Sequence, residues 1–193
     1  MKTATVTLQG TAPISFSKHL DEESVPKREG ENHEDYDIRV WREKAHFVKD
    51  EVVIPGINFK FMMDWTAAQL GLKIQGRGNK TWSTIFKAGV LCPDPMALGV
   101  TKDELKFTKV YCNADGRRGS AKRVWRRFPI LHEWGGEVAF YILDDTITED
   151  IFHRHVVQAG KICGLGRYRA SVGGQFGRFT VESFSWDDDL VEG

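Results

Sequence analysis

The chain has 193 residues, of which 41% are hydrophobic, and its 27 lysines and arginines balance its 27 aspartates and glutamates. This length suits one domain, or one domain with an insertion, and the zero net charge argues against a uniformly polybasic nucleic-acid binder. Three cysteines without a CxxC pair argue against a disulfide framework or a zinc finger, and no apolar run approaches the roughly 18 residues of a membrane span, so we expect a cytoplasmic protein without membrane contact.

The N-terminal half is predicted to contain two strands and a helix, separated by a charged insertion. Residues 3–9 alternate β-branched or polar with apolar side chains, which predicts a strand. Residues 17–50 form the insertion, with ten acidic and six basic residues between positions 21 and 50. Residues 52–56 predict a short strand that ends at Pro-Gly. A helix is predicted over 57–72, with one buried apolar face made by Ile57, Phe61, Trp65, Ala68 and Leu72.

The C-terminal half is predicted to be richer in strands. Residues 80–91 predict a short helix or irregular segment that runs into a strand, and further strands are expected at 105–113, 124–132, 137–143 and 178–186. The sequence Thr-Ile-Thr-Glu at 146–149 fits a capping box, which predicts a helix that starts there and ends near Cys163, with Gly164 as its C-terminal cap.

This order of elements predicts an α+β fold with a ferredoxin-like, RRM-related core. Such a core has a mainly antiparallel sheet and two helices, one in each half of the chain. We expect residues 1–193 to form a single domain, with the insertion at about 17–50 and an acidic tail at 187–193.

A glycine-rich stretch at residues 164–179 follows the last predicted helix. Its glycines are Gly164, Gly166, Gly173, Gly174 and Gly177, and its arginines are Arg167, Arg169 and Arg178. Glycine lets backbone amides approach a ligand closely, and arginine supplies a fixed positive charge suited to phosphate. Tyr168 and Phe176 are candidates for stacking on bases. The stretch is therefore expected to lie along a nucleic-acid backbone, and the alternative is a structural loop that needs tight turns.

A second basic segment lies at residues 117–127, which hold six basic residues and no acidic one. The candidate contacts here are Arg117, Arg118, Lys122, Arg123, Trp125 and Arg126. If the segment is a β-hairpin, Arg123 and Trp125 share one face and Arg126 lies on the other. Basic residues would neutralise phosphates and Trp125 could stack on a base of a single strand. The alternative is a solvated hairpin that pairs with the acidic insertion or tail of the same or a neighbouring molecule.

Three short motifs in chain order resemble one family. Residues 53–60 read Val-Ile-Pro-Gly-Ile-Asn-Phe-Lys and resemble the Ile-Pro-Gly-Ser-Ser-Leu-Lys-Gly signature of the backbone subunits of CRISPR effector complexes, which belong to the RAMP superfamily. The glycine-rich stretch is similar to the glycine-rich loop of that superfamily, and the Gly-Thr-Ala-Pro at 10–13 is similar to the continuation of its first strand. The resemblance implies an RRM-related core that binds a nucleic-acid backbone.

The resemblance also implies roles for individual residues. Lys60 lies in the first turn of the predicted helix, where the N-terminus attracts anions, and its family equivalent faces the nucleic-acid backbone; Asn58 is a further donor. The alternative for Lys60 is an exposed surface lysine. RNA-cleaving members of the family carry an aspartate near the end of the first strand, which has no convincing match at 14–21. His19 and Asp21 are the only, weak, catalytic candidates.

We therefore predict a subunit that binds single-stranded nucleic acid, RNA rather than DNA, and assembles head-to-tail along the strand in an antiviral ribonucleoprotein complex. Its expected partners are the strand, copies of itself and other subunits, and we expect no metal and no cofactor. The chain lacks the GK[ST] ending of a nucleotide-binding loop. Two alternatives stay open. One is an RNA endonuclease of the same superfamily. The other is an interaction protein, phage-borne for example, that mimics such a subunit without binding nucleic acid.

Overall fold

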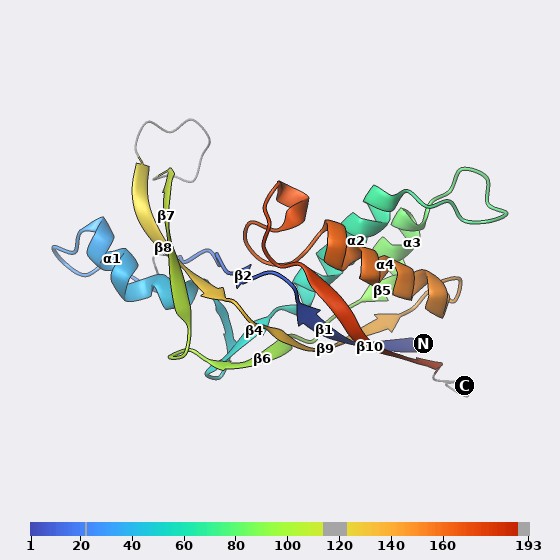
Figure 1. The fold of residues 1–193 in the computed structure, drawn as a ribbon, viewed down its shortest axis with the longest axis horizontal. Coiled ribbons are helices and arrows are strands. Elements are labelled where there is room, and N and C mark those ends of the chain that lie inside the picture. The colour runs from blue at the N-terminus through green and yellow to red at the C-terminus, as the bar shows by residue number, and fades with distance from the viewer. Residues whose placement is uncertain (22, 114–122, 189–193) are drawn as a thin grey trace.

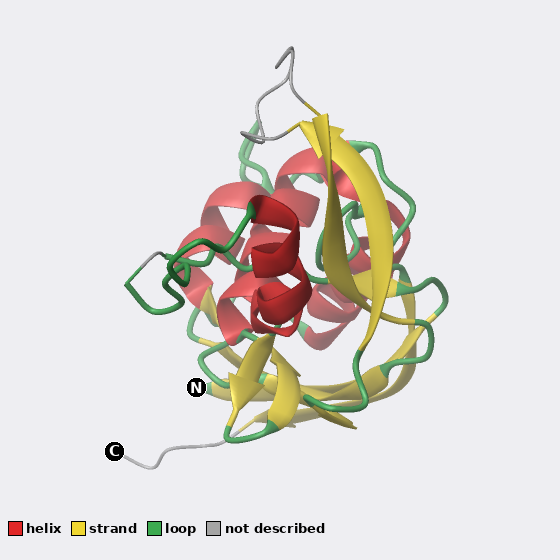
Figure 2. Ribbon diagram, turned by 90° about the vertical axis from the view of Figure 1, so that its left-hand side faces the viewer, coloured by secondary structure: helices red, strands yellow, loops and turns green. Residues whose placement is uncertain are grey.

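The computed structural model describes residues 1–21, 23–113 and 123–188. A four-stranded antiparallel sheet in the order β10-β1-β9-β5 forms its base (Figures 1 and 2). These strands are β1 (Lys2–Gly10), β5 (Val90–Leu91), β9 (Gly135–Ile142) and β10 (Phe179–Asp188). Strand β1 alternates buried Ala4, Val6 and Leu8 with partly exposed residues, as expected for a strand with one face on the core.

Three helices cover one face of this sheet (Figure 2). They are α2 (Gly56–Leu70), α3 (Trp82–Gly89) and α4 (Glu149–Ile162). In chain order, β1, α2, β5, β9, α4 and β10 follow the βαββαβ pattern, and α3 is an addition between α2 and β5. The prediction of an α+β fold with mainly antiparallel sheets is confirmed. The described residues contain four α-helices: the two expected core helices, α3 where a short helix or irregular segment was predicted, and a further helix in the insertion.

Two smaller antiparallel sheets extend the molecule. One pairs β3 (His46–Val48), β4 (Glu51–Ile54) and β6 (Met96–Thr101). The other has the order β2-β8-β7, with β2 (Ile14–Ser15), β7 (Lys106–Asn113) and β8 (Arg123–Leu131). Figure 1 shows that the β7–β8 hairpin projects from the body of the molecule beside α1 (His33–Val40). No helix within the described ranges is long and apolar enough to cross a membrane.

The predicted insertion packs on β8 through a helix and the turn that follows it. Its helix α1 is capped by the Asn32 side chain, which accepts from the amides of Glu34 and Asp35, and it continues into a short 3₁₀ turn, η1 (Trp41–Lys44). Helix α1 and this turn pack on β8.

The predicted acidic tail begins inside a strand. Asp187 and Asp188 pair with β1 as the last residues of β10, and the rest of the predicted tail lies outside the described residues.

Helix α2 forms where it was predicted, but its buried face is a different one. Phe59, Met62, Met63 and Ala67 are buried against the sheet, and the Ile57-Phe61 side of the helix faces solvent. The prediction of a core stripe through Ile57 and Phe61 is therefore wrong, because α2 carries two apolar rows and the other row packs on the sheet.

The predicted capping box is also wrong. Helix α4 begins at Glu149 with Thr148 as its N-cap, two residues later than the Thr146 that the motif indicated. The physical reason is a local competitor, because Asp144 Oδ1 accepts from the Thr146 amide at 2.9 Å and from the Thr146 hydroxyl at 2.5 Å. Such turns divert a threonine from helix capping.

Candidate nucleic-acid interface

The glycine loop, residues 164–177, folds back on itself after α4. The Leu165 amide donates to the Gly177 carbonyl at 3.0 Å, and the Gly177 amide donates to Pro13 O at 2.8 Å. A Cβ on Gly177, whose φ is +68°, would lie 1.8 Å from the Leu165 carbonyl oxygen. A Cβ on Gly174 would lie 1.8 Å from Tyr168 O. These two glycines are therefore required for closure of the loop itself.

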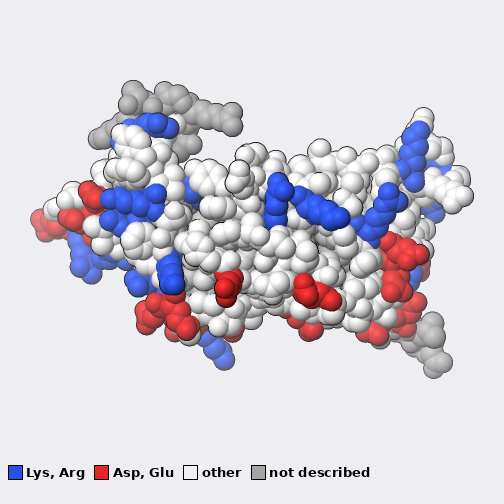
Figure 3. All heavy atoms as spheres, viewed as in Figure 1, with Lys and Arg blue, Asp and Glu red and all other residues white. Residues whose placement is uncertain are grey.

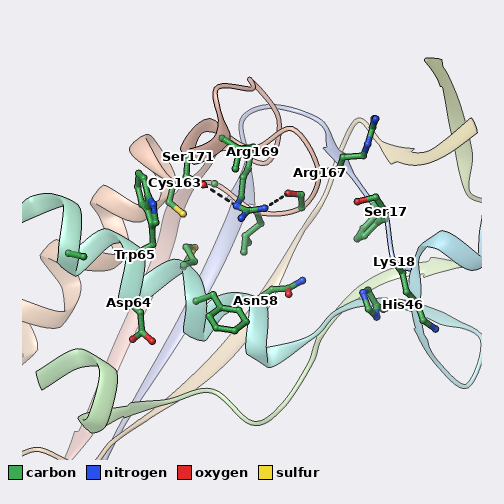
Figure 4. A pocket seen from close by; sticks show the side chains of 18 of the residues that line it. Ser17, Lys18, His46, Asn58, Asp64, Trp65, Cys163, Arg167, Arg169 and Ser171 are labelled. Carbon is green, nitrogen blue, oxygen red and sulfur yellow. Dashed lines mark hydrogen bonds between the residues drawn. The ribbon is translucent and has the colours of Figure 1, made fainter. Parts of the chain in front are cut away.

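The closed loop forms one wall of a groove of about 700 Å³, which we call the loop groove. Helix α2 forms the opposite wall and residues 16–18 with His46 form one end (Figure 4). Predicted site residues that line it are Asn58, Gly164, Gly166, Arg167 and Arg169. Residues that the sequence reasoning missed are Lys18, Phe61, Trp65 and Lys87, among others. The structure thus brings the two family-like motifs, from the start of α2 and the glycine loop, to one place.

The two arginines of the loop are held in fixed orientations. Arg169 Nε donates to Ser171 Oγ at 3.0 Å and its Nη1 donates to Gly166 O at 3.2 Å. The guanidinium carbon of Arg167 lies 3.5 Å from the ring centre of Phe128 and 3.9 Å from that of Tyr168. Burial lowers the pKa of Arg167, and its Nη1 is buried with no hydrogen-bond partner among the described residues. Arg167 therefore joins the glycine loop to the β7–β8 hairpin through cation–π contacts.

A second groove, of about 1010 Å³, lies between α1 and the β7–β8 hairpin. We call it the hairpin groove; Arg123, Trp125 and Arg126 line it, together with Tyr111 and His19. Ser17 and Lys18 line both grooves, so the two are neighbours along one surface. Figure 3 shows basic side chains across the upper half of one face of the molecule and acidic ones along its lower edge.

The hairpin carries a ladder of aromatic and basic side chains on one face. Tyr111 and Trp125 are cross-strand partners with ring centres 5.1 Å apart. Lys109 Nζ lies 5.4 Å from the Trp125 ring centre, and the Arg123 guanidinium lies 5.4 Å from that of Tyr111. The β7–β8 register places Arg123 and Trp125 on the same face, as predicted. Lys109 and Tyr111 were not predicted as site residues, although they lie two residues apart in a predicted strand and so share one face.

Part of the opposite charge of the insertion and the hairpin is neutralised within the molecule. The buried carboxylate of Asp37 accepts from Lys44 Nζ at 2.5 Å and from the Arg127 amide at 2.8 Å. Glu34 lies 3.7 Å from Lys109 and 4.0 Å from Arg127. These pairs match the alternative in which the basic hairpin contacts the acidic insertion of the same chain.

Lys60 does not line either groove. It forms an i,i+4 ion pair with Asp64, and its Nζ also donates to the Phe86 carbonyl at 3.2 Å. Asp64 itself lines the loop groove, so Lys60 neutralises a carboxylate there. Arg178 is exposed, and its carbonyl accepts from the amides of Thr11 and Ala12.

The remaining predicted residues are scattered. Tyr168 is exposed next to Arg167. Gly173 faces open space, since no heavy atom lies within 4 Å of a Cβ placed there. His19 is exposed at the hairpin groove. The Asp21 carboxylate accepts one hydrogen bond from the Ser24 amide at 2.6 Å and another from the Ser24 hydroxyl at 2.8 Å. These hydrogen bonds lower the pKa of Asp21. The positions outside the described residues are Arg117, Arg118 and Lys122.

Neither of the two histidines of α4 joins a candidate site. His155 is buried, with its ring centre 4.3 Å from that of Phe86 and Nδ1 2.6 Å from the Ile151 carbonyl oxygen, and burial lowers its pKa. His153 contacts the Phe184 ring at 4.9 Å. Within the described part of the chain, no group of three His, Cys, Asp or Glu side chains is placed to hold a metal ion.

Comparison with known proteins identifies the class of fold. No protein-family model matches the sequence, and no curated protein matches it. A chain of the cryo-EM structure of Type III-B Cmr-beta bound to cognate target RNA is similar, with a TM-score of 0.52 and 14% sequence identity over 96% of this chain. A chain of a CRISPR RNA-guided surveillance complex has a TM-score of 0.42 and 10% identity, covering 95% of this chain and 68% of that one.

The likeness to the Type III-B Cmr-beta chain shows a shared fold, that of a protein in a CRISPR complex, with an RRM-like core. The present chain spans 60% of the length of that chain. Since the identity is 14%, the likeness concerns the fold alone.

Proposed function

We propose that this chain is a RAMP-type subunit that binds single-stranded nucleic acid, RNA more tightly than DNA, without regard to sequence. The observation that carries the proposal is the pair of neighbouring grooves that meet at Ser17 and Lys18. Proteins that bind single strands combine a positively charged groove, which follows the backbone, with aromatic side chains on which bases stack. Both grooves have this composition.

The two grooves would take different parts of one strand. In the loop groove, Lys18, Arg167 and Arg169 supply cations beside the glycine loop. In the hairpin groove, Arg123 and the exposed Trp125 offer a cation and a stacking surface. A strand passing over Lys18 would contact both, which gives this lysine the central place in the proposed path.

RNA is the favoured strand because the similar Type III-B Cmr-beta structure is one bound to cognate target RNA. We also propose head-to-tail assembly of copies along the strand, together with other subunits of a ribonucleoprotein complex. The zero net charge supports this, since successive copies would not repel strongly. Asp37 does not contribute to such assembly, because its carboxylate is buried and paired within the chain.

The test is fluorescence anisotropy with nuclease-treated protein and labelled 20-mers of uridine RNA, thymidine DNA and duplex DNA. We expect binding of both single strands, tighter for RNA, and weak binding of the duplex. About three phosphate contacts would lower the association constant about 20-fold between 50 and 200 mM salt. Light scattering on mixtures with longer RNA would show complexes whose mass grows with strand length.

Lys18→Glu should weaken RNA binding at least tenfold, because it reverses the charge where the grooves meet. Lys73→Glu is the matched control, since Lys73 is an exposed lysine that lines neither groove. Wild-type protein that binds none of the strands would overturn the proposal and favour a protein partner. Equal binding by both variants would overturn the proposed path.

A further inference from the structure

Helix α2 carries a second apolar row, of which two members are exposed and the third, Trp65, is half-buried. Phe59, Met62, Met63 and Ala67 pack on the sheet, as the core row of the helix. On the other side, at four-residue spacing, Ile57 is 53% exposed and Phe61 is 64% exposed. Trp65 follows in the same row and is half-buried, with one part of its side chain against the core. A helix that is apolar on both sides is normally buried on both sides. Exposed apolar rows of this kind mark sites of contact.

The outer row runs into the loop groove. Phe61 and Trp65 line that groove, and Val172, 58% exposed on the 3₁₀ turn η2 (Ala170–Val172), lines it from the glycine-loop side. Figure 4 shows Trp65 near Cys163 and Ser171 of the opposite wall, with Arg169 alongside. One wall of the loop groove is therefore aromatic, and the other carries arginines.

The groove carries no uncompensated negative charge from the helix. Asp64 lies between Phe61 and Trp65 in sequence and lines the groove, but Lys60 pairs with it one turn earlier. Lys18 and Lys87 line the same groove. Lysine is depleted at the centres of protein–protein interfaces, whereas cations beside aromatic rings are typical of single-strand binding sites. The composition therefore favours a nucleic-acid occupant over a protein one.

We propose that Phe61 and Trp65 form a stacking platform for the bases of the bound strand, so that the loop groove holds bases against α2 and the backbone against the glycine loop. This inference rests on the proposed function and adds to it a base-binding wall. Stacking on a π-face accepts any base, which agrees with binding without regard to sequence. Phe61 is the residue to test, since it is the more exposed of the two and makes little contribution to the core.

The experiment compares a uridine 12-mer with an abasic ribose-phosphate 12-mer, using wild-type protein and three variants of Phe61. Phe61→Ala should weaken uridine 12-mer binding about 5- to 100-fold, the loss typical of one stacked base. Phe61→Tyr should retain the affinity and Phe61→Leu should not, since leucine is apolar without a π-face. On the abasic strand, wild-type protein and Phe61→Ala should bind equally.

Two controls separate this inference from the proposed function. Ile57→Ala removes another exposed apolar residue of the same row that does not line the groove, and this variant should bind the uridine 12-mer like wild-type protein. Lys18→Ala should weaken binding of both strands, because it removes a backbone contact. Wild-type protein that binds neither strand contradicts the proposed function. Three outcomes overturn the stacking platform alone when wild-type protein binds RNA. In the first, Phe61→Ala binds the uridine 12-mer as tightly as wild-type protein does. In the others, Phe61→Leu retains the affinity, or Phe61→Ala loses the same affinity on the uridine and abasic strands.

Discussion

Replacing Asp37 by leucine should loosen the attachment of α1 to the β7–β8 hairpin. The Asp37 carboxylate is 7% exposed and accepts from Lys44 Nζ at 2.5 Å, the Arg127 amide at 2.8 Å and Arg127 Nη1 at 3.4 Å. Leucine leaves the Lys44 ammonium, on a side chain 11% exposed, without its charged partner. Removing one partner of a buried pair costs about 3–5 kcal/mol of unfolding free energy.

The lower end of that range applies here. Lys44 Nζ keeps its hydrogen bond to Arg127 O at 2.7 Å and lies 4.7 Å from the Phe128 ring centre, so part of its stabilisation survives. A loss of about 3 kcal/mol corresponds to a fall in Tm of about 6–12 °C for a chain of this size.

The effect should depend on pH, with a sign set by Lys44. Burial lowers the pKa of Lys44, and Asp37 partly opposes this by raising it. A lysine whose pKa is lower in the folded than in the unfolded state destabilises the protein fully below the folded pKa, and this cost is relieved as the pH rises through it. Asp37→Leu lowers the folded pKa of Lys44 further, so its stability deficit should be largest at neutral pH and shrink toward pH 10.

The assay is thermal and urea unfolding followed by circular dichroism at several pH values from 6 to 10. Glu34→Gln is the control on the same helix, since Glu34 is 62% exposed and its pairs are worth at most about 1 kcal/mol. Asp37→Leu with Lys44→Met should recover part of the lost stability, because Lys44 is no longer a buried cation without its partner, whereas the Arg127 amide and guanidinium still lack the Asp37 carboxylate. The reasoning is refuted if Asp37→Leu costs no more than Glu34→Gln, or if the double variant is less stable than Asp37→Leu.

Three further predictions concern the groove, the glycine loop and the core. Lys60→Met should weaken RNA binding several-fold, because it leaves the Asp64 carboxylate that lines the loop groove without its cation. Lys60→Met with Asp64→Asn should restore binding in fluorescence anisotropy. A double variant as weak as the single one would instead indicate direct phosphate contact by Lys60. Gly177→Ala should lower the free energy of unfolding in urea by about 3 kcal/mol, because its Cβ would lie 1.8 Å from a carbonyl oxygen. Gly173→Ala, with open space around its Cβ, should lower it by about 1 kcal/mol, and equal losses would contradict the closed loop. Wild-type protein should lose stability as the pH falls below 6.5, since burial lowers the pKa of His155 and of His46. His155→Phe should flatten part of that dependence, and a pH profile of urea unfolding identical to that of wild-type protein would refute the role of His155.

The order of the core strands and helices could be predicted because its signals are local, whereas β2, β3 and β6 were not predicted. The alternation in β1, Pro-Gly at 55–56 and Gly164 at the end of α4 each act over a few residues. The attachment of α1 could not be predicted in the same way, because the partners that hold it in place are distant in sequence. Asp37 meets Arg127 90 residues later, and no periodicity connects them. The sequence therefore offered the pairing of insertion and hairpin only as an alternative, without the residues that make it.

The outer row of α2 was misassigned for a different reason, since periodicity identifies an apolar row without saying what it faces. The backbone at Gly56 decides the question, because a Cβ there would lie 2.2 Å from the Cys92 carbonyl oxygen. The side of the helix that carries Gly56 must therefore face inward, and Phe59, Met63 and Ala67 follow from it at helical spacing. The Pro-Gly signature thus indicates both the start of the helix and its rotation. The row that includes Phe61 is then the one that remains available to a ligand in the loop groove.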